Sequence, residues 1–144
     1  MIEQDTVRLL RECDAGVKMG VDAIEQTLPH VKSAKLKNEL AESRSEHEAL
    51  DRRLQKLLDR YHDDGKDPNP MAKGMSWIKT NAKLALEDDD ATVADLITDG
   101  CNMGVKSLRK YLNQYKAADE DSKKVAKDLI DLEEKLTLQM RSYL

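Results

Sequence analysis

The stretch LKNELAESRSEHEALDRRLQKLL, residues 36–58, decides the fold of this 144-residue chain. Its inward positions recur every three or four residues, which predicts an amphipathic helix over 34–62 that begins at the N-cap Ser33 and ends before Pro68. At 1.5 Å per residue this helix is about 40 Å long, so it needs equally long partners. The stripe consists of Leu36, Leu40, Ser43, His47, Leu50, Leu54, Leu57 and Tyr61.

Stripes with the same period predict three further long helices, over 5–28, 90–116 and 120–143. Pro29 ends the first, and the carboxylates of residues 88–90 cap the start of the next. Asn69 followed by Pro70 opens a shorter pattern that predicts a crossover helix over 70–86. We therefore expect one all-α domain over 1–144, an up-down-up-down four-helix bundle made of two helical hairpins joined by that crossover.

The composition supports this fold and excludes several classes of function. Charged residues make up 36% of the chain, aromatic residues make up 3% and Phe is absent, which is typical of long solvated helices and not of a β-sandwich. The net charge of −4 argues against nucleic acid as a partner. No apolar segment has the length of a membrane span or a signal peptide, so we expect a cytoplasmic protein with no membrane partner.

A short repeat links the first and third long helices. Residues 13–18, CDAGVK, match residues 101–106, CNMGVK, at four of six positions. Glycines at 16, 20, 100 and 104 interrupt the same two helices, and each costs about 0.8–1.0 kcal/mol relative to alanine. The simplest explanation for glycines at these positions is close packing of the two helices, and the alternative is room for a ligand between them.

The chain resembles the ferritin-like superfamily, and more narrowly the small bacterial ferritin-like four-helix proteins classed as a domain of unknown function. The resemblance rests on residues 36–58 together with RECDAGVKMGVDAI (11–24), MAKGMSWIKTNAKLAL (71–86) and DGCNMGVKSLRKYL (99–112). It implies a di-metal centre in which each hairpin supplies an inward Glu from its first helix and a Glu-x-x-His from its second.

The residues that should form this implied centre are mostly of the wrong type. Val17 and Val105 stand where the first-helix glutamates are expected, and Leu136 stands where the second histidine is expected. Before His47 the pattern is Arg-x-x-His, with Arg44 in place of the glutamate. The sequence therefore predicts that apolar packing replaces the di-metal centre.

His47 still allows two interpretations. The first is a core histidine that is hydrogen-bonded across the bundle to Asp14 or to a hydroxyl, and the second is a ligand for iron or zinc. Cys13 and Cys101 are expected to be small buried hydrophobes, although they can also join His47 in a soft mononuclear site. We expect Asp14 at the edge of the bundle. The complete set of candidate metal ligands is His47, Glu46, Glu48, Asp14, Cys13, Cys101 and Glu134.

No catalytic residues and no cofactor are predicted, because the chain has no nucleophile-base ordering, no phosphate-binding glycine loop and no H-E-x-x-H pattern. The leading hypothesis is a non-catalytic bundle that acts through a protein partner or as a homodimer. The apolar residues Met71, Met75, Trp77 and Ile78 of the crossover are a candidate contact. The alternatives are a metal-binding protein of oxidative stress, with iron or zinc, and a bundle that senses a small molecule.

Overall fold

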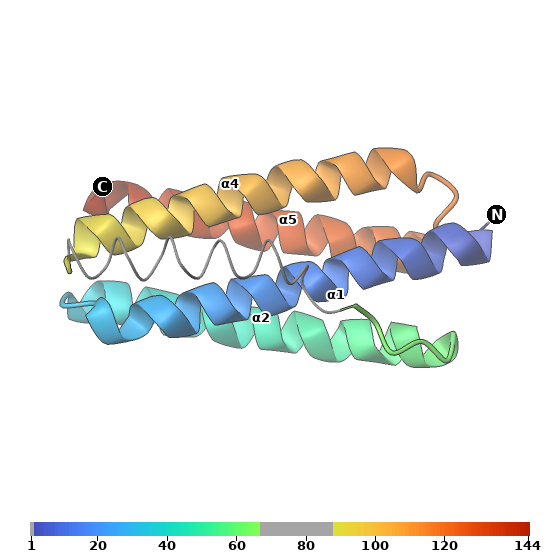
Figure 1. The fold of residues 1–144 in the computed structure, drawn as a ribbon, viewed down its shortest axis with the longest axis horizontal. Coiled ribbons are helices and arrows are strands. Elements are labelled where there is room, and N and C mark those ends of the chain that lie inside the picture. The colour runs from blue at the N-terminus through green and yellow to red at the C-terminus, as the bar shows by residue number, and fades with distance from the viewer. Residues whose placement is uncertain (1, 67–87) are drawn as a thin grey trace.

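The structure, a computed structural model, describes residues 2–66 and 88–144, and this part of the chain is all-helical (Figure 1). The predicted long helices are confirmed with small shifts at their ends. The predicted crossover helix over 70–86 and the candidate contact around Trp77 lie outside the described residues. The helices are α1 (Ile2–Thr27), α2 (Ala34–Arg60), α4 (Asp90–Gln114) and α5 (Glu120–Met140), with single 3-10 turns at Leu28–His30 and Arg141–Tyr143.

The helices run up, down, down and up, so the strict up-down-up-down order predicted from the sequence is wrong. The start of α4 lies beside the start of α2, where the Asp90 carboxylate accepts the backbone N–H groups of Lys32 and Ser33 at 2.7 and 3.0 Å. The start of α5 lies beside the start of α1, where Thr6 accepts the Asp119 N–H. Each hairpin is antiparallel as expected, but α2 and α4 are parallel because the chain leaves α2 at one end of the bundle and enters α4 at the other (Figure 1).

Short polar residues begin three of the helices, and the caps at Ser33 and within residues 88–90 were predicted from the sequence. The side chains of Ser33, Asp89 and Asp119 each accept a backbone N–H from the first turn of the helix that follows. Such caps satisfy N–H groups that have no partner inside the helix. The carboxylates of residues 88–90 therefore cap the start of α4 and contact residues near the start of α2.

The core consists of two apolar clusters, one toward each end of the bundle. The larger contains Leu10 and Val17 of α1, Leu54 of α2 and Leu129 of α5. The smaller contains Ile24 of α1, Leu40 of α2, Ile97 of α4 and Met140 of α5. The stripe predicted for residues 36–58 is buried throughout, including Ser43 and His47. The polar pair described in the next subsection lies between the two clusters.

Asp14 is fully buried, so its predicted place at the edge of the bundle is wrong. Its carboxylate accepts hydrogen bonds from the Lys18 Nζ, the Gln55 Nε2 and the backbone N–H of Lys66, each at 2.9 Å. Gly65 has a φ of +84°, and a Cβ at this position would collide with the Asp14 carboxylate. Burial is tolerated because three donors surround the charge, and Asp14 thereby fastens the segment after α2 onto α1.

We expect Asp14→Ala to lower the free energy of unfolding by about 3 kcal/mol, because it removes a buried acceptor of three hydrogen bonds. Urea denaturation measures the loss. Glu48→Ala is the matched control, since that carboxylate is half-exposed, and it should change the free energy by less than about 0.5 kcal/mol. Equal losses in the two variants would show that Asp14 does not anchor the loop.

Candidate functional site

A polar layer divides the two apolar clusters at the middle of the bundle. Each helix contributes one residue to it: Gly20 from α1, His47 from α2, Gly104 from α4 and Glu133 from α5. His47 is fully buried and Glu133 is 8% exposed. We call these four residues the central layer. On every helix the central-layer residue falls between the residues of one apolar cluster and those of the other.

Both ring nitrogens of His47 are engaged by protein atoms. The Nδ1 lies 2.8 Å from the backbone carbonyl of Ser43, one turn earlier on α2. The Nε2 lies 2.8 Å from Oε1 of Glu133 on α5. A carbonyl oxygen only accepts hydrogen bonds, so the contact with Ser43 favours a ring that carries a proton on Nδ1, and the Ser43 hydroxyl lies 3.5 Å from the same nitrogen.

The carboxylate of Glu133 raises the affinity of His47 for a proton. Burial alone lowers the pKa of the imidazole, because it disfavours the charged ring. The hydrogen bond to Glu133, its negative charge and the hydrogen bond to the Ser43 carbonyl act in the opposite direction and prevail, so the pKa of His47 lies above its ordinary value of 6.5. The pair is therefore a buried, charge-assisted hydrogen bond between α2 and α5.

Gly20 makes room for this pair. A Cβ at position 20 would lie 2.8 Å from Nε2 of His47, closer than real Cβ contacts allow. A Cβ at Gly104 would lie 3.7 Å from Oε2 of Glu133 and one at Gly16 would lie 3.6 Å from Leu129, both ordinary contacts. Gly16, Gly20 and Gly104 thus face side chains of α2 and α5 and not each other, whereas a Cβ at Gly100 would meet nothing within 4 Å.

The other carboxylates proposed as metal ligands lie on the surface. Glu46 accepts a hydrogen bond from Lys135 at 3.0 Å, and Glu134 accepts one from Arg109 at 3.1 Å. Glu48 lies 3.9 Å from Arg44 in an exposed pair. Within residues 2–66 and 88–144, no three metal-ligating side chains converge into a cluster that would hold an ion.

Cys13 and Cys101 are buried free thiols, as predicted, but they do not share a site. Cys13 lies in the larger apolar cluster and Cys101 lies in the smaller one. The repeat misleads here because α1 and α4 are antiparallel, so residues that precede the central layer on each helix lie on opposite sides of it. Burial raises the pKa of Cys13 to about 12, and burial together with the nearby Glu133 raises the pKa of Cys101.

Glu133 is the functional side chain that the sequence reasoning missed, and its neighbour Glu134 was chosen instead. The α5 stripe contains Leu129 and Leu136, and Glu133 stands four residues after the first and three before the second. This spacing places Glu133 on the inward face of the helix, whereas Glu134 is rotated a further 100° toward solvent. The periodicity therefore contained the signal. His47 is a buried core histidine as predicted, but its partner across the bundle is Glu133 and not Asp14 or a hydroxyl, and the hydroxyl near its ring, that of Ser43, is on α2 itself.

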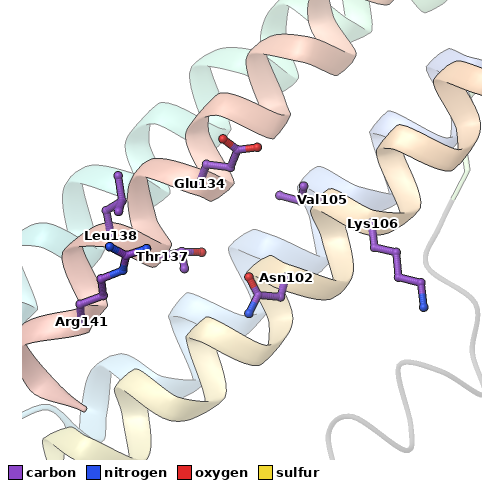
Figure 2. Close-up of a pocket in the computed structure, with 7 residues that line it drawn as sticks. All are labelled: Asn102, Val105, Lys106, Glu134, Thr137, Leu138 and Arg141. Atoms are coloured by element: carbon purple, nitrogen blue, oxygen red, sulfur yellow. The ribbon is translucent and has the colours of Figure 1, made fainter.

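A shallow groove of about 400 Å³ lies between α4 and α5 on the surface (Figure 2). Figure 2 shows Val105 and Thr137 facing the space between the two helices and Lys106 pointing away from α5. Leu138, on the rim, is 56% exposed, and Met103 on α4 is 63% exposed. The groove is lined by Asn102, Val105, Lys106, Glu134, Thr137, Leu138 and Arg141.

The described residues define an all-α helical bundle with a closed polar pair at its centre. None of the described helices combines the length and the apolar character needed to cross a membrane. Comparison of the chain with protein-family models, with curated proteins and with solved structures finds no match in any of the three.

We expect Gly20→Ala to destabilise the protein by about 1–2 kcal/mol, because the new methyl group overlaps the His47 ring. Gly100→Ala is the control, since a Cβ there meets nothing within 4 Å, and the better helix propensity of alanine should stabilise by up to about 1 kcal/mol. Thermal and urea unfolding measure both changes.

A double variant separates the clash from other effects of Gly20→Ala. With His47→Ala already present, the added methyl group has no ring to meet, so Gly20→Ala should become neutral or stabilising. If Gly20→Ala is equally destabilising in both backgrounds, the ring of His47 is not what requires a glycine.

Proposed function

We propose that this chain is a non-catalytic, ferritin-like four-helix bundle without a di-metal centre, and that it acts by binding a second copy of itself. The observation that carries the first half of this proposal is the composition of the central layer. Two of its four residues, Gly20 and Gly104, have no side chain, and the other two, His47 and Glu133, are hydrogen-bonded to each other.

The path of the chain supports the ferritin-like part of the proposal. Ferritin-like bundles consist of two helical hairpins joined by one long crossover, so their second and third long helices run parallel. In this chain α2 and α4 run parallel in the same way, and their starting residues meet through Ser33 and Asp90.

The central layer does not fit a di-metal centre. Such a centre takes bridging carboxylates and capping imidazoles from all four helices. Here the inward positions of α1 and α4 are glycines, one carboxylate comes from α5, and the single imidazole already uses both nitrogens. We therefore assign the pair of His47 and Glu133 a structural role, and we assign no reaction to it.

The surface supports the second half of the proposal. Leu138 and Met103 are large apolar side chains more than half exposed on neighbouring helices, and Leu138 borders the groove between α4 and α5. The groove lining also carries both signs of charge, with the cations Lys106 and Arg141 and the anion Glu134. A two-fold interface brings each patch against its own copy, so a patch with cations and an anion is complementary to itself.

The metal content tests the first half of the proposal. Protein purified anaerobically with excess Fe(II), and then desalted, should retain no stoichiometric metal, and neither should His47→Ala prepared in parallel. Elemental analysis makes the measurement. Two metals per chain, or one metal that is lost in His47→Ala, would overturn the proposal and favour the metal-binding alternative.

The oligomeric state tests the second half. Light scattering after size exclusion should give a dimer for the wild type and a monomer for Leu138→Glu, because the new charge would be buried at the contact. Ile2→Glu is the matched control, since Ile2 is 64% exposed on α1 and should leave the dimer intact. A wild-type monomer at about 100 μM, a concentration well above a micromolar dissociation constant, would contradict self-association.

A further inference from the structure

The contact between His47 and Glu133 contains one shared proton. While Nδ1 of His47 donates its proton to the Ser43 carbonyl, the 2.8 Å contact between Nε2 and Oε1 is a hydrogen bond only when one of these two atoms is protonated. If that proton leaves to a base in solvent, a ring lone pair and a carboxylate oxygen face each other at the same distance. This arrangement is repulsive, and if the one remaining ring proton moves to Nε2 the ring gives up its hydrogen bond to the Ser43 carbonyl. In both tautomers the buried Glu133 carboxylate loses the positive charge that compensates it, so loss of the proton weakens the contact.

We propose that the contact between His47 and Glu133 is a proton-dependent latch that holds α2 against α5 at the middle of the bundle and opens as the pH rises. This inference concerns the stability and local opening of the bundle and is independent of its self-association. The open state exposes the central layer, while the apolar clusters on either side keep the bundle folded.

The surroundings of the pair favour a local opening. Three surface ion pairs join α2 to α5, and all of them are partly exposed and weakly stabilising. They are Lys135 with Glu46 at 3.0 Å, Arg53 with Asp128 at 2.9 Å and Arg60 with Asp121 at 3.4 Å. The negative charge of Glu46 acts on His47 in the same direction as Glu133, toward the protonated ring.

From the other helices, α1 and α4 present glycines to the pair, and α4 adds the Cys101 thiol beside Glu133. The ionised forms of both neighbours, Cys101 and Glu46, are anions. Neither of them can compensate for an unprotonated Glu133, so loss of the shared proton leaves an uncompensated negative charge in the central layer.

The direction of the pH dependence follows from the folded-state pKa of His47, which lies above its unfolded value. The stability that the pair contributes is fully present below pH 6.5, the ordinary pKa of histidine, and is lost as the pH rises through the folded-state pKa. Asp and Glu groups elsewhere make the stability of the protein rise with pH in the acidic range. The stability measured above pH 6.5 therefore reports on the latch.

Glu133→Gln provides a sharp test, because an amide can donate to an unprotonated Nε2 while Nδ1 still donates to Ser43. This variant keeps the contact without the shared proton. Between pH 6.5 and pH 9, the melting temperature of the wild type should fall by about 3–6 °C relative to Glu133→Gln, whose own profile should be flat. Glu48→Gln, at the exposed carboxylate that follows His47 on α2, is the control and should follow the wild type.

Local opening has a separate readout in the two buried thiols. Iodoacetamide labelling followed by mass spectrometry of the peptides compares Cys101, which lies beside the pair, with Cys13, which lies in the larger apolar cluster. In the wild type the ratio of Cys101 to Cys13 labelling should rise severalfold from pH 6.5 to pH 9. In Glu133→Gln the ratio should stay constant. Because both thiols react as thiolates, their ratio cancels most of the reagent's own pH dependence.

Two results would overturn the latch. One is a wild-type melting profile parallel to that of Glu133→Gln between pH 6.5 and pH 9, and the other is a labelling ratio that does not change with pH in the wild type. If Glu133→Gln fails to fold, the labelling ratio of the wild type alone still decides the question. Both measurements compare variants and pH values at one protein concentration, and light scattering reports the oligomeric state separately, so failure of the latch is distinguishable from failure of the proposed self-association.

Discussion

A hydrogen bond between an imidazole of α2 and a carboxylate of α5 sets the arrangement at the middle of this bundle. Buried charged groups are tolerated when every polar atom has a partner, and His47 meets that condition through the Ser43 carbonyl and Glu133. The pair also needs space, which Gly20 supplies by having no Cβ. The two apolar clusters then pack on either side of a layer whose residues are not interchangeable with leucine or valine.

The helices were predictable from the sequence because amphipathic periodicity is a local signal. The stripe from Leu36 to Leu57 and the cap at Ser33 appear in the structure as expected. The order of helix directions was not predictable in the same way, because it depends on where the chain re-enters the bundle after α2. The burial of Asp14 was also missed, since its donors at Gln55 and Lys66 are distant in sequence and no periodic pattern connects them.

The candidate site was half predictable. His47 was identified because a histidine within an apolar stripe stands out, but its partner was sought at Asp14. The repeat of residues 13–18 in 101–106 suggested that Cys13 and Cys101 occupy equivalent places, and antiparallel packing of α1 and α4 puts them in different clusters. Pairing between helices is a tertiary property, so Glu133 was recognisable as inward-facing from the sequence without being recognisable as the partner of His47.

The central claim, that the polar atoms of His47 are satisfied within the protein by Ser43 and Glu133, is tested most directly by nitrogen NMR of the imidazole in ¹⁵N-labelled protein. The account predicts that Nδ1 carries a proton with the chemical shift of a hydrogen-bonded N–H, and that the Nε2 resonance of His47 changes in Glu133→Gln. A neutral ring protonated at Nε2, with an unprotonated Nδ1 and no response to Glu133→Gln, would contradict it.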